Sequence, residues 1–302
     1  MPASKRLSEV LEKSVQLQFN DYSKIVLMSD CHRGDGGWSD NFSNNQNLFF
    51  AALTYYYERG YTYIELGDGD ELWENRNIET IINTHSDCFW LMSQFYRVGR
   101  FYMLYGNHDI VKRDIKFSKT NCDSFFCDSI NSRLALFPDI EVKEGISLVY
   151  EKTGDRILLT HGHQADILND TFWILSRFLV RYLWRPLDLI GIRDPTSAAK
   201  NDGRKNTVEK RLYEYAEKNN QMIITGHTHH PVFPKAGEPP YFNDGSCVHP
   251  RCITSIEISN GAISLVKWAT MIKQDRSLYV GRETLEAPVK LMNYFNSIPK
   301  KH

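Results

Sequence analysis

The chain has 302 residues, of which 42% are hydrophobic and 24% charged, as expected for a globular protein with a sizeable core. Its formal net charge of -1 offers no general attraction to a polyanion, so long nucleic acid is not expected as a ligand. No uncharged apolar run reaches about 18 residues, and the first residues lack the apolar segment of a signal peptide, so neither a leader nor a spanning helix is expected.

The six cysteines include no C-x-x-C pair, which argues against a thiolate zinc site. Six cysteines are also too few for a disulfide framework in a chain of this length. We therefore expect reduced thiols and a cytoplasmic location.

Five short apolar runs, rich in β-branched and aromatic residues, each end in polar residues that can bind a metal. These runs are 24–30, 61–68, 101–108, 156–161 and 221–227. Short runs of this composition predict buried strands. Helical patterns at 44–59, 78–98 and 207–219 lie between them. The alternation predicts an α/β fold, in which ligands bind beyond the carboxyl ends of the strands.

The C-terminal third predicts further, antiparallel strands. Segments 253–259 and 262–268 flank Asn260-Gly261, a strong signal for a β-hairpin. The chain shows no internal repeat and no convincing linker, so a single domain over residues 1–302 is expected.

The polar residues after the apolar runs form five motifs. In chain order they are Asp30-x-His32, Gly67-Asp68, Gly106-Asn107-His108-Asp109, His161-Gly-His163 and Gly226-His227-x-His229. Taken singly, each motif is as well explained by turn formation or by a surface histidine. Their joint occurrence at strand ends favours a metal site, because burying several carboxylates and imidazoles without a cation is costly. Carboxylate, amide and imidazole donors suit Mn, Zn or Fe.

The ordered pattern D-x-H, G-D, G-N-H-[DE], His and G-H-x-H, which spans Asp30 to His229, resembles the calcineurin-like metallophosphoesterases. The resemblance implies a four-layer α/β sandwich of two mixed β-sheets flanked by helices. It also implies two divalent metal ions. We expect Mn ahead of Fe or Zn, and a helical cap insertion at about 167–205.

Matched position by position, the resemblance implies a role for each motif residue. The first ion would bind Asp30, His32 and His229, and the second Asn107, His161 and His227. Asp68 would bridge the two ions, and His108 would be the catalytic acid for the leaving group. Asp109 is expected either to orient His108 or to serve a turn, and His163 either to support the site or to be exposed.

The chain most resembles the branch that contains the UDP-2,3-diacylglucosamine diphosphatases. The likeness rests on segments 67–73, 226–231 and 241–246. That branch carries Arg at the position of His108, and a His there matches the wider family. The difference leaves the expected metal chemistry intact, and it makes a lipid-linked substrate one alternative among several. Arg33 also departs from the branch, and its guanidinium is expected to reach either a substrate phosphate or a surface salt bridge.

Segment 171–185 predicts a helix in which Arg177, Arg181 and Arg185 share one face, and Pro186 would end or kink it. One interpretation is a core-packed helix with solvated or paired arginines. The other is a cap over the site, with apolar surface for a lipid and with Arg177 and Arg181 for substrate phosphate. The second interpretation includes peripheral contact with a membrane.

These features predict a metal-dependent phosphoesterase that hydrolyses a phosphate mono- or diester, or a diphosphate, of a phosphorylated small molecule or lipid-linked substrate. The attacking group would be a hydroxide that bridges the two metal ions. A pyrophosphatase of the UDP-diacylglucosamine type is the alternative within this class. The alternative from another class is a membrane-surface or partner-binding scaffold on the same fold. The sequence does not predict the oligomeric state.

Overall fold

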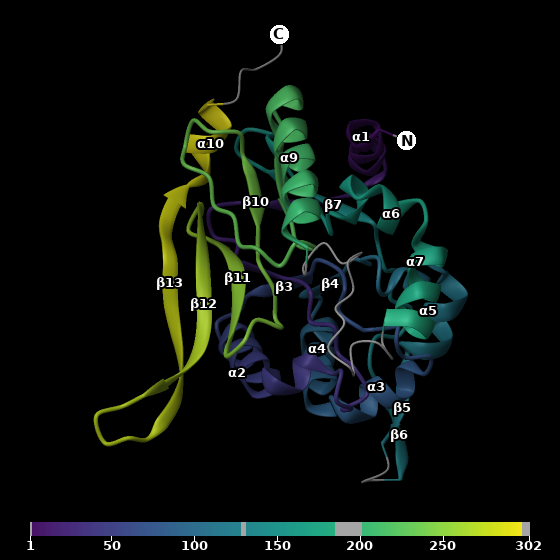
Figure 1. Cartoon of the computed structure of the whole chain (residues 1–302). Coiled ribbons are helices and arrows are strands. Elements are labelled where there is room, and N and C mark those ends of the chain that lie inside the picture. The colour runs from purple at the N-terminus through teal and green to yellow at the C-terminus, as the bar shows by residue number, and fades with distance from the viewer. Residues whose placement is uncertain (1, 128–130, 185–200, 298–302) are drawn as a thin grey trace.

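Two mixed β-sheets lie at the centre of the protein (Figure 1), in a computed structural model that describes residues 2–127, 131–184 and 201–297. The order of the first sheet is β1 (Val15–Phe19), β7 (Gly145–Tyr150), β8 (Arg156–Thr160), β9 (Met222–Thr225) and β10 (Tyr241–Asn243). The order of the second sheet is β13 (Leu278–Lys290), β12 (Ala262–Ile272), β11 (Cys252–Ser259), β2 (Ile25–Met28), β3 (Thr62–Glu65) and β4 (Phe101–Met103).

Helices cover the outer face of each sheet. The second sheet packs against α2 (Gln46–Glu58), α3 (Ile78–Thr84) and α4 (Ser86–Arg97). The first packs against α1 (Ala3–Lys13) and α9 (Asp202–Asn219), and α10 (Leu291–Ser297) packs against the core between the sheets. These helices and sheets form the predicted four-layer α/β sandwich, which confirms the fold class.

Burial on both faces explains why the central strands read as continuous apolar runs. In β2, Val26 and Met28 face the helix-covered core, whereas Ile25 and Leu27 face the core between the sheets. In β9, Ile223 packs under α1 and α9 while its neighbours face the core between the sheets. Successive side chains of a strand point to opposite faces, so each strand serves two cores.

The strand pairing brings the motif-bearing strand ends together. Strands β2, β3 and β4 run parallel in the second sheet, and β8 and β9 run parallel in the first. The predicted hairpin is also present, since β11 and β12 pair in antiparallel register. At its turn, Asn260 and Gly261 have φ of 52° and 65°, the left-handed pair that a tight hairpin requires.

Two predicted helices differ from the observed ones. The expected helix 78–98 is divided into α3 and α4 at His85, whose buried imidazole contacts Asp40 and Gln46 instead of continuing the helix surface. The expected helix 171–185 is α7 (Trp173–Leu179) followed by the π-helical segment η5 (Val180–Trp184). Arg185 and Pro186 lie outside the described residues.

Shorter elements complete the described part of the chain. They are η1 (Asn41–Asn44), η2 (Ile110–Arg113), α5 (Ile115–Asn121), β5 (Ser124–Cys127), β6 (Ser132–Ala135), η4 (His163–Ala165) and α6 (Ile167–Asp170). Of the helices in this part, none combines the length and the apolar character needed to cross a bilayer. The expected insertion at 167–205 contains α6, α7 and η5, and its role as a cap stays a prediction.

Candidate metal centre

Three of the five motif loops leave their strands through unusual backbone conformations. Left-handed φ angles of 46–71° occur at Asp30, His32, Asp68, His227 and His229. Non-glycine residues rarely adopt this region, and such strain gathers at functional sites. Backbone hydrogen bonds join the first two loops, because the amide of Asp30 donates to Gly67 and that of His32 donates to Asp68. The turns therefore direct consecutive polar side chains into a single space.

Two glycines in the motifs are required by close packing. A Cβ atom on Gly106 would lie 2.1 Å from Oδ1 of Asp68, and one on Gly226 would lie 2.0 Å from Oγ of Ser29. Both distances are far inside van der Waals contact. Glycine thus lets the third and fifth loops approach the carboxylates of the first two.

The predicted ligands form two adjoining clusters. In the first, Nε2 of His229 lies 3.0 Å from Oδ1 of Asp30 and 3.3 Å from Nε2 of His32. In the second, which joins Asp68, His161 and His227, Nε2 of His161 lies 3.1 Å from Oδ2 of Asp68. Nε2 of His32 lies 3.8 Å from Asp68, so the carboxylate of Asp68 stands between the two clusters. In each cluster the potential ligand atoms lie within 4.8 Å of one another, which fits a cation.

Asn107 provides an independent test of that fit. Its side chain is buried, and neither its amide oxygen nor its amide nitrogen has a hydrogen-bond partner among the described residues. An unpartnered buried amide is costly unless another group, such as a metal ion, supplies a bond. Its neighbour His108 donates its backbone N–H to Asp68 at 2.7 Å, which places this loop beside the second cluster.

Strong electrostatic coupling marks the centre. Burial lowers the pKa of His161, but the carboxylates of Asp68 and Asp30 outweigh burial and raise it to about 9. Burial raises the pKa of Asp68, and the surrounding His161, His108 and His32 more than reverse this, so its pKa lies below the ordinary range. Nδ1 of His161 lies 3.0 Å from the carbonyl of Leu66, so it donates there and leaves Nε2 toward Asp68.

Glu71 holds two of the predicted site residues and was not singled out from the sequence. Its carboxylate lies 2.9 Å from Nδ1 of His32 and 2.8 Å from Nδ1 of His108. Both imidazoles therefore donate to Glu71 and present Nε2 to the centre. Burial lowers the pKa of His108, but Glu71 and Asp68 outweigh burial and raise it above its ordinary value. Trp73 stacks on the imidazole of His108 with ring centroids 4.2 Å apart.

Asp109 does not reach His108, contrary to one of its two predicted roles. Its carboxylate accepts from the backbone amides of Gly69 and Gly106 and pairs with Lys112. It thereby joins the G-D loop to the G-N-H-D loop.

Arg33 lies in a buried ion network beneath the centre. Its guanidinium is 0% exposed and contacts Glu65 at 2.8 Å and Asp70 at 2.7 Å. Lys112 completes the network by pairing with Asp70 and Asp109. With its guanidinium enclosed, Arg33 has no path to a substrate phosphate, and the salt bridges that it forms are internal and not at the surface. The prediction of substrate contact is corrected accordingly.

Arg177 and Arg181 differ in their surroundings. Arg177 lies over the ring of Trp173, 4.9 Å from its centroid, in the same helix. Arg181 donates to the carbonyls of Leu72 and Trp73 at 2.8 and 2.7 Å, so η5 rests on the loop that carries Glu71. Large apolar side chains of this region face solvent, namely Ile167, Leu168, Phe172, Ile174, Leu175, Phe178, Tyr182 and Leu183.

Two further residues lie beside the second cluster. His163 is buried, with its ring centroid 5.5 Å from that of His161, so exposure, one of its two predicted outcomes, is not observed. Asp166, not singled out from the sequence, lies 3.5 Å from Nε2 of His227 and pairs with Arg204. Carboxylates behind metal-binding imidazoles commonly fix the ring orientation.

Two features are typical of metal-dependent phosphoesterases. They are the sandwich of two mixed sheets and the cluster of Asp, His and Asn donors at the strand ends. A family model described as calcineurin-like phosphoesterase matches residues 23–231, and the chain belongs to this family.

Two solved structures give weaker likenesses. Vacuolar Protein Sorting 29 from Cryptosporidium parvum is 13% identical, with 88% of this chain and 98% of that chain covered and a TM-score of 0.35. Vps29 of Chaetomium thermophilum is 10% identical, with 88% and 96% covered and a TM-score of 0.40. No curated protein matches the chain.

Proposed function

We propose that the protein hydrolyses a phosphate ester or diphosphate at two divalent metal ions, with Mn expected ahead of Fe or Zn. The first ion would be held by Asp30, His32 and His229, the second by Asn107, His161 and His227, and both by Asp68. The observation that carries the proposal is the buried amide of Asn107, which has no partner in the described part of the chain and lies beside two clusters of carboxylate and imidazole donors.

When bound, two such cations supply a Lewis acid for a phosphoryl oxygen and ionise water near neutral pH. The protein's own side chains would supply the proton that the leaving oxygen requires. His108 is held by Glu71 and by stacking on Trp73, and the carboxylate of Glu71 raises the pKa of the imidazole, which favours its protonated form. Since its Nδ1 is engaged by Glu71, Nε2 is the atom that can donate a proton to the leaving oxygen.

The test combines metal analysis with a substrate panel. The parent protein and Asp68→Asn are loaded with Mn, desalted and assayed on p-nitrophenyl phosphate, bis-p-nitrophenyl phosphate, a UDP-sugar and a cyclic nucleotide. We expect about two ions per chain and turnover in the parent, and loss of both in the variant. A variant with its full metal complement would refute the bridging role. A metal-loaded parent that is inactive on every ester would refute the enzymatic proposal.

A lipid-linked diphosphate, as in the UDP-diacylglucosamine branch, is a second candidate supported by the apolar surface near α7. Phe172, Ile174 and Phe178 are each more than half exposed. Such a surface fits an acyl chain or the edge of a membrane. Co-sedimentation with anionic and neutral vesicles tests this. It compares Phe178→Ser, in α7, with Tyr22→Ser, at a residue that is 92% exposed in a turn elsewhere in the chain. Equal sedimentation of the two variants would oppose the lipid-linked candidate.

A further inference from the structure

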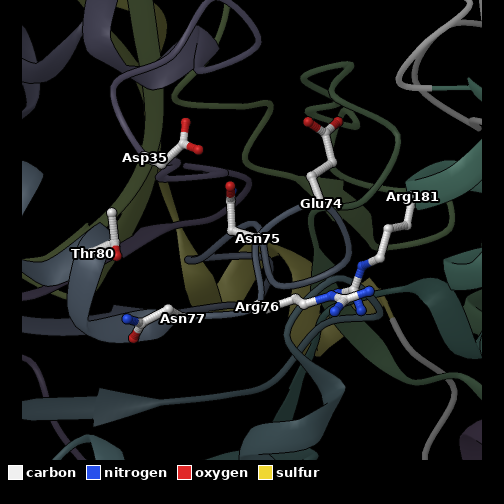
Figure 2. Close-up of a pocket in the computed structure, with 7 residues that line it drawn as sticks. All are labelled: Asp35, Glu74, Asn75, Arg76, Asn77, Thr80 and Arg181. Atoms are coloured by element: carbon white, nitrogen blue, oxygen red, sulfur yellow. The ribbon is translucent and has the colours of Figure 1, made fainter.

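A polar pocket lies beside the loop that holds the catalytic acid. It has a volume of about 360 Å³ and is lined by Asp35, Glu74, Asn75, Arg76, Asn77, Thr80 and Arg181 (Figure 2). This volume falls in the range of small-molecule sites. Residues 74–77 continue directly from Trp73, which stacks on His108. One side of the pocket is therefore formed by the same loop that carries Trp73.

Two arginines converge at one end of this pocket. Figure 2 shows the guanidinium groups of Arg76 and Arg181 meeting there, and Arg76 donates to the hydroxyl of Tyr182. Burial lowers the pKa of Arg181, and the nearby charges of Arg177 and Arg76 lower it further. Within the described ranges, neither Arg76 nor Arg181 forms an ion pair with a carboxylate. Like charges held together without a counterion favour the binding of an anion, and the planar guanidinium suits phosphate.

The other end of the pocket has a different chemistry. Asp35, Asn77 and Thr80 lie away from the two guanidinium groups (Figure 2). Carboxylate, amide and hydroxyl groups accept from and donate to hydroxyls, as a sugar requires, and the carboxylates oppose a polyanion that would fill the whole pocket. The pocket thus offers one position for the anionic group of a ligand and another for its hydroxyl groups.

We propose that this pocket binds a sugar that carries a phosphate, with the phosphate on Arg76 and Arg181 and the sugar hydroxyls toward Asp35, Asn77 and Thr80. The proposal rests on the proposed function, since it assigns the substrate to the nucleoside and glycosyl phosphates and places the group that is not attacked beside the metal centre. Aryl phosphates, which have neither a second phosphate nor a sugar, would bind without the pocket.

The test measures binding and turnover separately in the metal-loaded, full-length protein. Calorimetric titration with UMP and with glucose 1-phosphate is carried out on the parent, Arg76→Ala, Arg76→Lys and Arg181→Lys. Lysine is used at Arg181 because the side chain also supports the carbonyls of Leu72 and Trp73. Arg59→Ala, an arginine whose side chain is 48% exposed elsewhere on the surface, is the control.

We expect Arg76→Ala to weaken binding of at least one probe about tenfold or more, as for loss of a charge-assisted hydrogen bond, and Arg76→Lys to restore part of it. We also expect KM for a UDP-sugar to rise in Arg76→Ala and to be recovered in part in Arg76→Lys, whereas Arg59→Ala should leave it unchanged. If the parent binds neither probe, or if Arg76→Ala binds both as tightly as the parent, the pocket proposal is wrong. Binding that depends on Arg76 in a protein without turnover would sustain the pocket and refute the enzymatic proposal instead.

Discussion

Replacing Glu71 by Gln should uncouple His108, the proposed catalytic acid, from His32, a proposed metal ligand. The carboxylate accepts from Nδ1 of both His32 and His108, at 2.9 and 2.8 Å. A glutamine amide has a single oxygen acceptor, so one imidazole loses its partner and the other exchanges a charged acceptor for a neutral one. A charge-assisted bond contributes about 1.5–3 kcal/mol and a neutral one about 1 kcal/mol. The imidazole left without a partner should therefore lose about 1.5–3 kcal/mol of stabilisation, and the other about 0.5–2 kcal/mol.

The readout is the pH dependence of kcat on two esters with good and poor leaving groups. The raised pKa of His108 keeps it protonated as pH rises, so removing the charge of Glu71 should move the alkaline limb of the profile to lower pH. On the poor leaving group, turnover at alkaline pH should fall by about two- to 160-fold, which is the loss of about 0.5–3 kcal/mol at His108 expressed as a rate factor. Glu58→Gln, at an exposed carboxylate, is the control. An unchanged alkaline limb together with unchanged metal affinity would show that Glu71 holds neither imidazole.

Four further changes test other parts of the structure. His108→Ala should keep its metal yet lose most turnover on poor leaving groups; equal activity across the substrate panel would exclude the acid role. Lys112→Met should destabilise the fold by about 3–5 kcal/mol in urea, because it leaves Asp70 and Asp109 buried with fewer counterions, whereas Lys119→Met at an exposed pair should change little. Gly106→Ala should displace Asp68 and lower metal content, whereas Gly203→Ala, where the nearest atom is 3.4 Å away, should not. Metal affinity should rise with pH up to about 9, because the raised pKa of His161 makes protons compete with the ion below that value; a flat pH dependence between 6 and about 9 would contradict this.

The sequence predicted the strands that bear the motifs because both of their faces are buried. Strand β2 is buried along its whole length and appears as an unbroken apolar run. By contrast, β1 and β13 are exposed at most positions, and their polar residues hide them from a search for apolar runs. Polar edge strands become evident only once a partner strand is known.

The candidate site was predictable where residue type alone limits the chemistry. Asp30, Asn107 and His161 were expected from their positions at strand ends, and the fold brings their loops together. The role of Glu71 could not be deduced in the same way, because its two imidazole partners come from separate loops. Its signal was its place between Asp68 and Trp73, in a segment quoted only as a family likeness. Arg33 was equally ambiguous, since its acidic partners Glu65 and Asp70 lie at the end of β3 and in the loop that follows it.

The left-handed backbone at five predicted ligands restricts which amino-acid substitutions these positions can accept during evolution. Asp, Asn, His and Gly tolerate that conformation, whereas valine, isoleucine and threonine do not. In a homologue that has lost activity, the backbone would therefore still restrict which amino acids can replace Asp30, His32, Asp68, His227 and His229. Its replacements should be drawn mainly from Gly and Asn, so a pseudoenzyme of this lineage would keep the loop shapes after losing its chemistry.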